Sequence, residues 1–206
     1  MNVQSFKPLV LGTFILFLLP LSGVAQSSNP VWPRTFRIVP AGSSVGFVMK
    51  ATLHKVKGKT GSVKGRVSLS LEESSVKMDG TIRIDASSLV TGNGRRDRSM
   101  RKNQLEVKSH PTILFRPTGL ADPVQDLFHQ KSATFQIRGD LTLHGVTKKL
   151  KIPVHAYRDQ GRILIEGSFP VELKDYNIKN PSRFLLRVKD RIRVWFNLEF
   201  TEDKGL

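Results

Sequence analysis

Apolar and polar residues alternate along most of the chain from residue 43 onward. In GSVKGRVSLSL at 61–71, Val63, Val67 and Leu69 share one face, whereas Lys64 and Arg66 lie on the other. A period of two is typical of a β-strand that is buried on one face only. The pattern predicts strands at 43–50, 61–71, 76–84, 133–143, 150–156, 163–169 and 192–200. Successive strands of this kind with short connections indicate an all-β chain, an antiparallel sheet closed as a barrel or folded as a sandwich.

Glycines interrupt the apolar faces of several predicted strands. They stand at Gly65, Gly80, Gly139 and Gly167. Glycine within a strand often marks a bend or a bulge, which a curving barrel requires. These positions also leave room in which a ligand could lie.

A helical pattern occurs in one place, DRSMRKNQLEVK at 97–108. Asp97 is the expected N-cap of this helix, and Pro111 follows its end. Because the segment is basic and lies between predicted strands, we expect a short helical insertion rather than a helical layer.

The alternation also fits a barrel that crosses an outer membrane, with its apolar face toward lipid and a polar lumen. The chain is short for such a barrel, is strongly basic and has no aromatic girdles at the ends of its predicted strands. These features favour a barrel whose apolar face lies inside.

The first 25 residues differ from the rest in composition. They hold one charge, Lys7, then an apolar run at 9–19, Pro20 and the small residues at 23–25. This layout is typical of a secretory signal peptide, and the run is shorter than the ~20 residues that a membrane anchor needs. We therefore expect a signal peptide at 1–25, a lead-in segment at 26–35, one β-barrel domain at 36–206, and a periplasmic or secreted protein.

The charge and the cysteine count narrow the set of partners. The 206 residues include 33 Lys and Arg against 17 Asp and Glu, for a net charge of +16, and no cysteine. Disulfides and thiolate metal sites are therefore excluded. A basic surface favours an anionic partner such as a membrane surface, although it also suits plain solubility. No nucleic-acid motif is present, so we expect no nucleic-acid partner.

The histidines fall in no pattern that indicates catalysis or metal binding. They are His54, His110, His129, His144 and His155. Their spacing matches no common metal-ligand motif, and the chain has no nucleophile elbow and no phosphate-binding loop. We therefore expect no catalytic residue, no cofactor and no metal, and we expect His144 and His155 to be surface residues. A hydrolase or isomerase that uses His144 or His155 is the alternative.

The stretch LTLHGVTKKLKI at 141–152 places His144 between two predicted strands. Gly145 can take a positive φ, so a hairpin turn is expected here. The stretch TGNGRRDR at 91–98 begins a group of arginines that could bind an anionic headgroup, because guanidinium groups match phosphate oxygens. The group consists of Arg95, Arg96, Arg98 and Arg101. Alternatively, Arg96 and Asp97 fasten the insertion by local ion pairs.

Three stretches together resemble a known family: IDASSLVTGNGRRDRSMR at 84–101, SHPTILFRPTGL at 109–120 and RGDLTLHGVTKKLKIPV at 138–154. From about Phe36 to Phe200 the chain is similar to the YceI-like family of polyisoprenoid-binding proteins. The resemblance implies an antiparallel lipocalin-like β-barrel whose apolar interior holds an isoprenoid or similar amphiphile. It also implies no catalytic set, a periplasmic or secreted location and, as in some members, a homodimer.

The chain departs from the family pattern at two places. Val39 and Gly42 stand where the family usually has Asp and His, and Ser99-Met100 stands where a His-Leu pair often follows Arg-Asp. If those histidines contact a headgroup in the family, that contact is missing here. Arginines at 95–101 could replace it.

The function expected from these observations is non-enzymatic carriage or sequestration of a long apolar or amphiphilic molecule. Burial of apolar surface contributes roughly 25 cal/mol per Å². The alternative is a basic module with a solid barrel core that binds a surface polyanion or a protein partner. The expected lining residues are Val45, Phe47, Met49, Val63, Val67, Leu69, Met78, Ile82, Phe115, Phe135, Ile137, Leu141, Val154, Ile165, Phe169, Val194 and Phe196.

Overall fold

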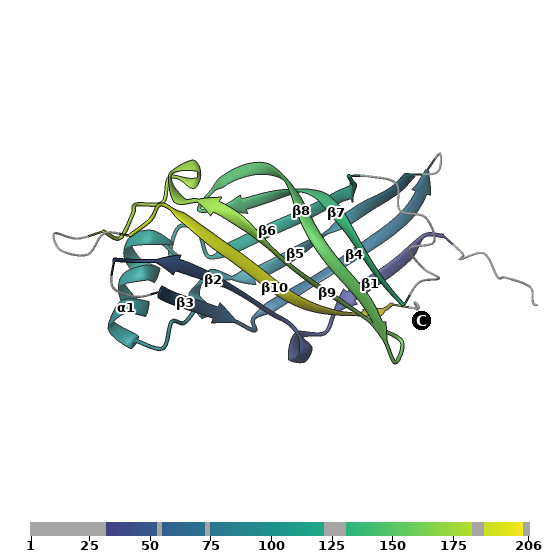
Figure 1. Cartoon of the computed structure of the whole chain (residues 1–206), viewed down its shortest axis with the longest axis horizontal. Coiled ribbons are helices and arrows are strands. Elements are labelled where there is room, and N and C mark those ends of the chain that lie inside the picture. The colour runs from purple at the N-terminus through teal and green to yellow at the C-terminus, as the bar shows by residue number, and fades with distance from the viewer. Residues whose placement is uncertain (1–31, 53–54, 73–74, 122–130, 183–187, 204–206) are drawn as a thin grey trace, which may run out of the picture.

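The computed structural model describes residues 32–52, 55–72, 75–121, 131–182 and 188–203 (Figure 1). The expected signal peptide and most of the expected lead-in segment lie outside these ranges. Within them, no helix has the length and apolar character needed to cross a membrane.

Antiparallel β-strands make up most of the described chain, and they form one sheet that closes on itself. Closure comes from the pairing of the first strand with the last, in which Phe36 faces Glu202 and Ile38 faces Phe200. The strands are β1 Arg34–Ile38, β2 Ser44–Lys50, β3 Lys55–Thr60, β4 Val63–Glu72, β5 Ser75–Asp85, β6 Thr112–Leu120, β7 Ser132–Leu143, β8 Val146–Asp159, β9 Arg162–Glu172 and β10 Arg191–Glu202. The prediction of an all-β antiparallel barrel is therefore confirmed.

Two of the eight positions around the barrel are each occupied by a strand in two pieces. The short 3-10 turn η1, Pro40–Gly42, separates β1 from β2, and both of these strands pair with β10. On their other side, β1 pairs with β4 and β2 pairs with β3. Beyond this break, the paired strands β2 and β3 form one end of the barrel, where they lie beside the insertion (Figure 1).

The insertion between β5 and β6 covers this end of the barrel (Figure 1). It contains the 3-10 turn η2, Ala86–Ser88, the helix α1, Gly94–Ser99, and the π-helical turn η3, Met100–Gln104. A further 3-10 turn, η4, Leu173–Tyr176, follows β9. Isolated pairing between Lys59 and Val90 ties the edge strand β3 to the insertion.

The helix begins three residues before the predicted start, and its predicted cap is wrong. Asn93 is the N-cap, because its side-chain oxygen accepts a hydrogen bond from the backbone N–H of Arg96 at 3.0 Å. Asp97 is instead buried within the helix and accepts hydrogen bonds from Thr91. An asparagine before a helix satisfies a backbone donor that otherwise has no partner.

The seven predicted strands are present, as β2, β4, β5, β7, β8, β9 and β10, and three further strands were not predicted. In β3, the inward positions Val56, Gly58 and Thr60 include only one strongly apolar residue. In β6, the consecutive apolar residues at 113–115 and the proline at 117 hide the period of two. The strand β1 begins at Arg34, two residues before the expected start of the domain.

Apolar side chains of the strands face the interior, as β8 shows. Ile152, Val154 and Ala156 are buried, whereas the alternate residues Lys151 and Pro153 are exposed. This orientation is the opposite of the one that the membrane-barrel alternative requires. The barrel therefore has an apolar interior and a basic, polar exterior.

The room left by two of the inward glycines is filled by neighbouring aromatic rings rather than left for a ligand. A Cβ atom at Gly139 would lie 2.5 Å from Cζ of Phe115, and one at Gly167 would lie 2.5 Å from Cζ of Phe196. Both glycines are therefore required for close packing of a ring across the sheet. The expectation that these positions hold open space was wrong.

Candidate ligand-binding cavity

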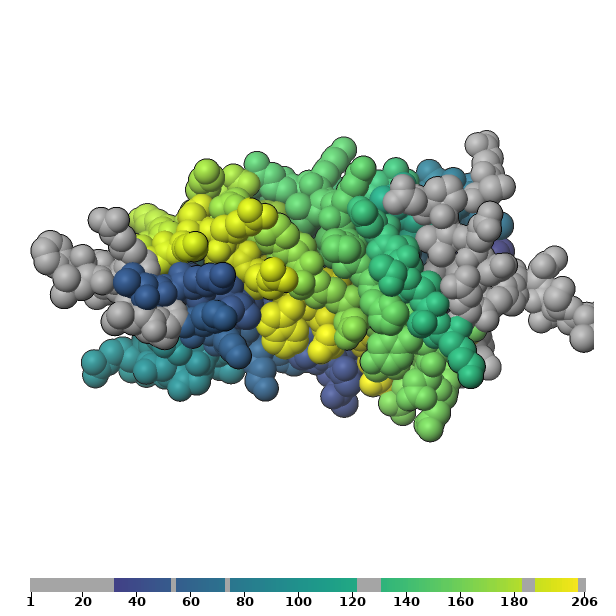
Figure 2. All heavy atoms as spheres, viewed as in Figure 1, coloured from purple at the N-terminus to yellow at the C-terminus, as the bar shows by residue number. Residues whose placement is uncertain are grey.

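The interior of the barrel contains a cavity of about 710 Å³. This volume lies in the range of roughly 300–1,000 Å³ that is typical of small-molecule sites. Each of the ten strands contributes at least one apolar side chain to the cavity wall. In Figure 2, side chains of β8, β9 and β10 form a continuous wall over the middle of the barrel on the face shown.

Sixteen of the seventeen expected lining residues border this cavity. Val63 does not: it is fully buried and packs in the apolar cluster that includes Phe36 and Ile84. That a ligand contacts the remaining residues stays a prediction. The residues that border the cavity as expected are Val45, Phe47, Met49, Val67, Leu69, Met78, Ile82, Phe115, Phe135, Ile137, Leu141, Val154, Ile165, Phe169, Val194 and Phe196.

The wall also contains residues that the sequence analysis missed. Phe36 and Val56 come from β1 and β3, which were not predicted, and Leu105 comes from the insertion. Ile152 and Leu143 lie on the apolar faces of predicted strands, so the period of two already marked them. No local signal marks Leu105, because its position depends on how the insertion folds back onto the barrel.

Polar and charged groups border the cavity at both of its ends. At the insertion end these include Thr91, Asn93 and Gln104, and at the far end they include Lys131 and Arg158. Partial burial, together with the charge of Arg34, lowers the pKa of the Arg158 guanidinium from its ordinary value. An apolar middle with polar ends is suited to an elongated amphiphile.

Thr91 joins the helix α1 to the segment that follows β5. Its hydroxyl and its backbone N–H both donate to Oδ1 of Asp97, whose side chain is buried. Arg96 donates from Nε to the Thr91 hydroxyl at 2.7 Å and from Nη2 to the Thr91 carbonyl at 2.9 Å. Arg96 and Asp97 therefore fasten the insertion through Thr91, a role close to the structural alternative considered above.

The four arginines proposed for headgroup binding do not lie together. Arg95 and Arg96 border the cavity, whereas Arg98 is exposed to solvent and Arg101 lies away from the cavity. Arg101 donates from Nη2 to the carbonyl of Leu89 at 3.1 Å, and its Nε is buried with no hydrogen-bond partner in the described part of the chain. The expectation that Arg98 and Arg101 lie at the cavity was therefore wrong, because their positions on the helical turns place their side chains away from it.

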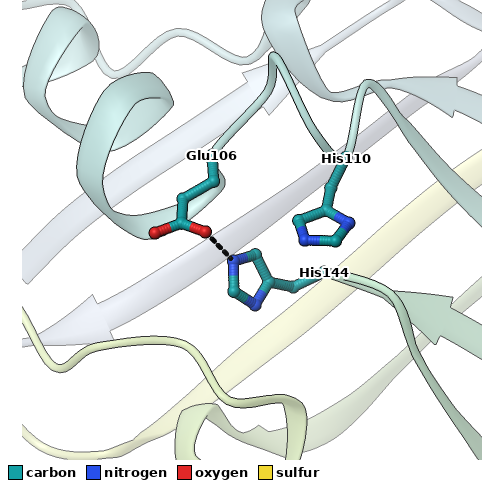
Figure 3. A group of neighbouring side chains, drawn as sticks. All are labelled: Glu106, His110 and His144. Carbon is teal, nitrogen blue, oxygen red and sulfur yellow. Dashed lines mark hydrogen bonds and ion pairs between the residues drawn. The ribbon is translucent and has the colours of Figure 1, made fainter.

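His144 occupies the predicted turn, but it is not a surface residue. It has φ of 50° and Gly145 has φ of 77°, so the hairpin between β7 and β8 is confirmed. The His144 side chain is only 10% exposed, with Nδ1 at 3.1 Å from the Tyr176 carbonyl and Nε2 at 3.2 Å from Oε2 of Glu106 (Figure 3). The ring of His110 lies 4.5 Å from that of His144, centroid to centroid.

Neither histidine considered for catalysis borders the cavity. His155 lies on the outer face of β8, where its Nδ1 is 3.1 Å from the hydroxyl of Thr134, and His144 is turned toward the insertion. The two histidines on which the hydrolase or isomerase alternative depends therefore do not line the interior. The remaining two histidines, His54 and His129, lie outside the described residues.

Comparisons with known proteins point to one family. The model of the YceI-like domain matches residues 36–200. A UPF0312 protein of Azotobacter vinelandii is 32% identical over 116 residues, which are 52% of this chain, and the chain spans about half (54%) of the length of that relative.

Solved structures with the same fold share little sequence with this chain. BcnA of Burkholderia cenocepacia superimposes with a TM-score of 0.64 at 17% identity, over 79% of this chain and 98% of that one. A polyisoprenoid binding domain from Saccharophagus degradans, implicated in plant cell wall breakdown, also gives 0.64 at 17% identity, over 82% and 98%. The YCEI protein of Campylobacter jejuni gives 0.56 at 16% identity, over 75% and 88%.

Proposed function

This chain belongs to the family of YceI-like domains, and on that basis we propose that it binds and carries a long apolar or amphiphilic molecule inside its barrel. The proposed ligand is a polyisoprenoid or a similar lipid, held without any catalytic step. The observation that carries the proposal is the cavity of about 710 Å³ with a wall of apolar side chains. The Saccharophagus degradans domain described as polyisoprenoid binding supports this class of ligand, since it has the same fold.

Burial of the ligand's hydrocarbon chain supplies the binding free energy. Each buried CH₂ group contributes about 0.8 kcal/mol, so a chain of several isoprene units gains a large favourable term. A preformed cavity reduces the ordering cost that offsets this gain. Aromatic side chains in the wall, such as Phe47, Phe115 and Phe196, supply broad contact surfaces for the chain.

Arg95 is the group best placed to meet an anionic headgroup. Arg95 borders the cavity at the insertion end, and its guanidinium group forms no hydrogen bond or ion pair with the described residues. The neighbouring Arg96 is held by two hydrogen bonds to Thr91, so it is less able to reorient. A guanidinium group forms charge-assisted hydrogen bonds to phosphate oxygens, which are stronger than neutral ones.

We further propose that the protein works in the periplasm or outside the cell, where the N-terminal segment at 1–25 would direct it. The net charge of +16 supports transient contact with an anionic membrane surface, from which an amphiphile could be taken up or to which it could be delivered. A homodimer stays a prediction. The alternative of a solid-core module is disfavoured by the cavity.

Competition with a fluorescent apolar probe tests the proposal. N-phenyl-1-naphthylamine, bound to the purified chain, is titrated with isoprenoid alcohols of increasing length. Because each added unit buries more hydrocarbon, we expect the affinity to rise about tenfold or more per isoprene unit until the cavity is filled. If the fold is intact and none of these alcohols displaces the probe, the proposal is contradicted.

A matched pair of variants tests the headgroup site. Arg95→Gln and Arg98→Gln each remove one positive charge, but only Arg95 borders the cavity. We expect Arg95→Gln to weaken an isoprenoid phosphate about tenfold and to leave the corresponding alcohol unchanged. Arg98→Gln should change neither affinity. Equal effects of the two variants would assign the contribution to net charge rather than to a site.

A further inference from the structure

Three metal-ligating side chains meet at the insertion end of the barrel, outside the cavity (Figure 3). Glu106 and His110 come from the segment between η3 and β6, and His144 comes from the turn between β7 and β8. One ligand atom from each residue lies within 4.8 Å of the others, and this is the only such group of three among the described residues. Residues 34 positions apart in the chain thus converge on one point, which no spacing motif in the sequence indicates.

The hydrogen bonds of His144 orient it for a cation. Nδ1 lies 3.1 Å from the carbonyl oxygen of Tyr176, which only accepts, so Nδ1 carries the proton and donates it. In the neutral ring, Nε2 is then an acceptor, yet it faces the carboxylate oxygen of Glu106 at 3.2 Å. Two acceptors at this distance need either a shared proton or a metal ion between them.

The dimensions also suit a metal ion. Zinc binds imidazole nitrogen at ~2.0–2.1 Å and carboxylate oxygen at ~2.0–2.2 Å, so two ligands on one tetrahedral ion lie roughly 3.3 Å apart. The Nε2–Oε2 separation of 3.2 Å is close to this value. A backbone carbonyl on the far nitrogen of a ligating histidine is a common outer contact, because it fixes the tautomer and the ring orientation. Tyr176 supplies that contact here.

Gly145 allows His110 to join the group. A Cβ atom at Gly145 would lie 2.8 Å from Cε1 of His110, so a larger residue would push the ring away. The His110 side chain extends from the loop before β6 toward the same space that the other two side chains face (Figure 3). The ligand atoms lie within 4.8 Å of one another, so a shift of the His110 ring by about 1.5 Å at most brings its nitrogen to the separation of roughly 3.3 Å expected for two ligands of one ion.

We propose that Glu106, His110 and His144 bind one divalent transition-metal ion, with Zn²⁺ as the representative. Two imidazoles and one carboxylate suit Zn²⁺ and its first-row neighbours rather than Ca²⁺ or Mg²⁺, which prefer all-oxygen sites. Three protein ligands leave a fourth position for water. The bound ion joins the insertion to the β7–β8 turn and therefore fixes one end of the barrel.

Calorimetric titration of the untagged chain with ZnCl₂ tests the proposal. We expect one site whose affinity falls at least tenfold in each of Glu106→Gln, His110→Gln and His144→Gln. Glu106→Gln is the most informative variant, because the amide can still donate to Nε2 of His144 and preserve the contact while it removes the anionic ligand. His155→Gln, on the outer face of β8, is the matched control and should leave the site unchanged.

A second readout separates metal binding from a structural role of these residues. Zn²⁺ should raise the thermal unfolding midpoint of the wild-type chain and of His155→Gln, but not that of Glu106→Gln, because an ion that binds only the folded state stabilises it. Binding that is absent in the wild type, or that is equal in the wild type and in Glu106→Gln, would overturn the proposal. Since none of the three residues borders the cavity, apolar-probe binding by each variant reports separately that the barrel is intact.

Discussion

The interior of the barrel and its insertion end are built in different ways. The interior is a wall of apolar side chains from every strand. The insertion end instead depends on a few polar groups in fixed contacts, such as Thr91 with Arg96 and Asp97, or His144 with Glu106. We therefore expect the interior to be most sensitive to a buried charge, whereas the insertion end should be sensitive to the loss of single hydrogen-bonding atoms.

A charge in the interior should have the largest effect. Val154 is 2% exposed and borders the cavity, so Val154→Asp places a carboxylate where no partner is available. Burial of an unpaired charge costs several kcal/mol, and we expect a loss of more than about 3 kcal/mol in urea unfolding together with loss of apolar-probe binding. Lys151→Asp, on the outer face of the same strand, should change stability by less than about 0.5 kcal/mol. Similar losses in both variants would contradict the account of the interior.

Val63 and Val67 separate the packed part of the interior from the hollow part. Both are buried on β4, but only Val67 borders the cavity. Val63→Ala removes two methyl groups from a fully packed site, so we expect a loss of about 2 kcal/mol in unfolding free energy and no change in probe binding. Val67→Ala should cost about half as much, because its side chain already lacks neighbours on one side, and should alter probe affinity. A larger cost for Val67→Ala than for Val63→Ala would contradict this distinction between a packed and a hollow part of the interior.

Removal of one hydroxyl at the insertion end should cost nearly as much as a core deletion. Thr91→Val keeps the shape of the side chain but removes the hydrogen bonds of its hydroxyl with Asp97 and Arg96. Because Asp97 is buried, we expect a loss of about 2 kcal/mol in urea unfolding. Thr142→Val, which removes an exposed hydroxyl paired with Thr147, is the control and should cost less than about 0.5 kcal/mol. Equal costs would mean that the insertion is not fastened through Thr91.

The smallest expected effect is a pH dependence at the start of the insertion. Hydrogen bonds from Ser87 hold the pKa of Asp85 below its ordinary value. A lowered folded-state pKa stabilises the protein above the unfolded-state value of about 3.9, and this contribution is lost as the pH falls through the folded-state pKa. Asp85→Asn should therefore have a lower urea midpoint than the wild type at pH 6, and the difference should shrink as the pH falls below the unfolded-state value of about 3.9. A difference that is constant with pH would rule out this linkage.

The same contrast explains what could be predicted from the sequence. The alternation around Val67 and Leu69 marks both the strand and the inward face, because a period of two carries this information locally. Fifteen of the sixteen lining residues follow from that rule, and the exception is Phe115 in β6, whereas Val63 shares the pattern but packs where the cavity does not reach. Local pattern thus predicts which face is buried, but not where the interior is hollow.

The insertion end could not be predicted because its contacts join distant segments. The turn at His144 follows from the glycine beside it, but its contact with Glu106 spans 38 residues and depends on the path of the insertion. Asp97 was the expected cap because it begins the helical pattern at 97–108, whereas Asn93, in a turn-forming Gly-Asn-Gly sequence, fills that role. Only the folded path of residues 86–111 reveals these partners.

The central claim is that the barrel carries an apolar molecule, and native mass spectrometry of the protein purified from the cells that make it tests this most directly. The account predicts a species heavier than the polypeptide, which on denaturation releases an apolar or amphiphilic molecule, and it predicts less of this species for Val154→Asp. A bare polypeptide of the expected mass, together with no binding of apolar probes by the folded protein, would contradict it.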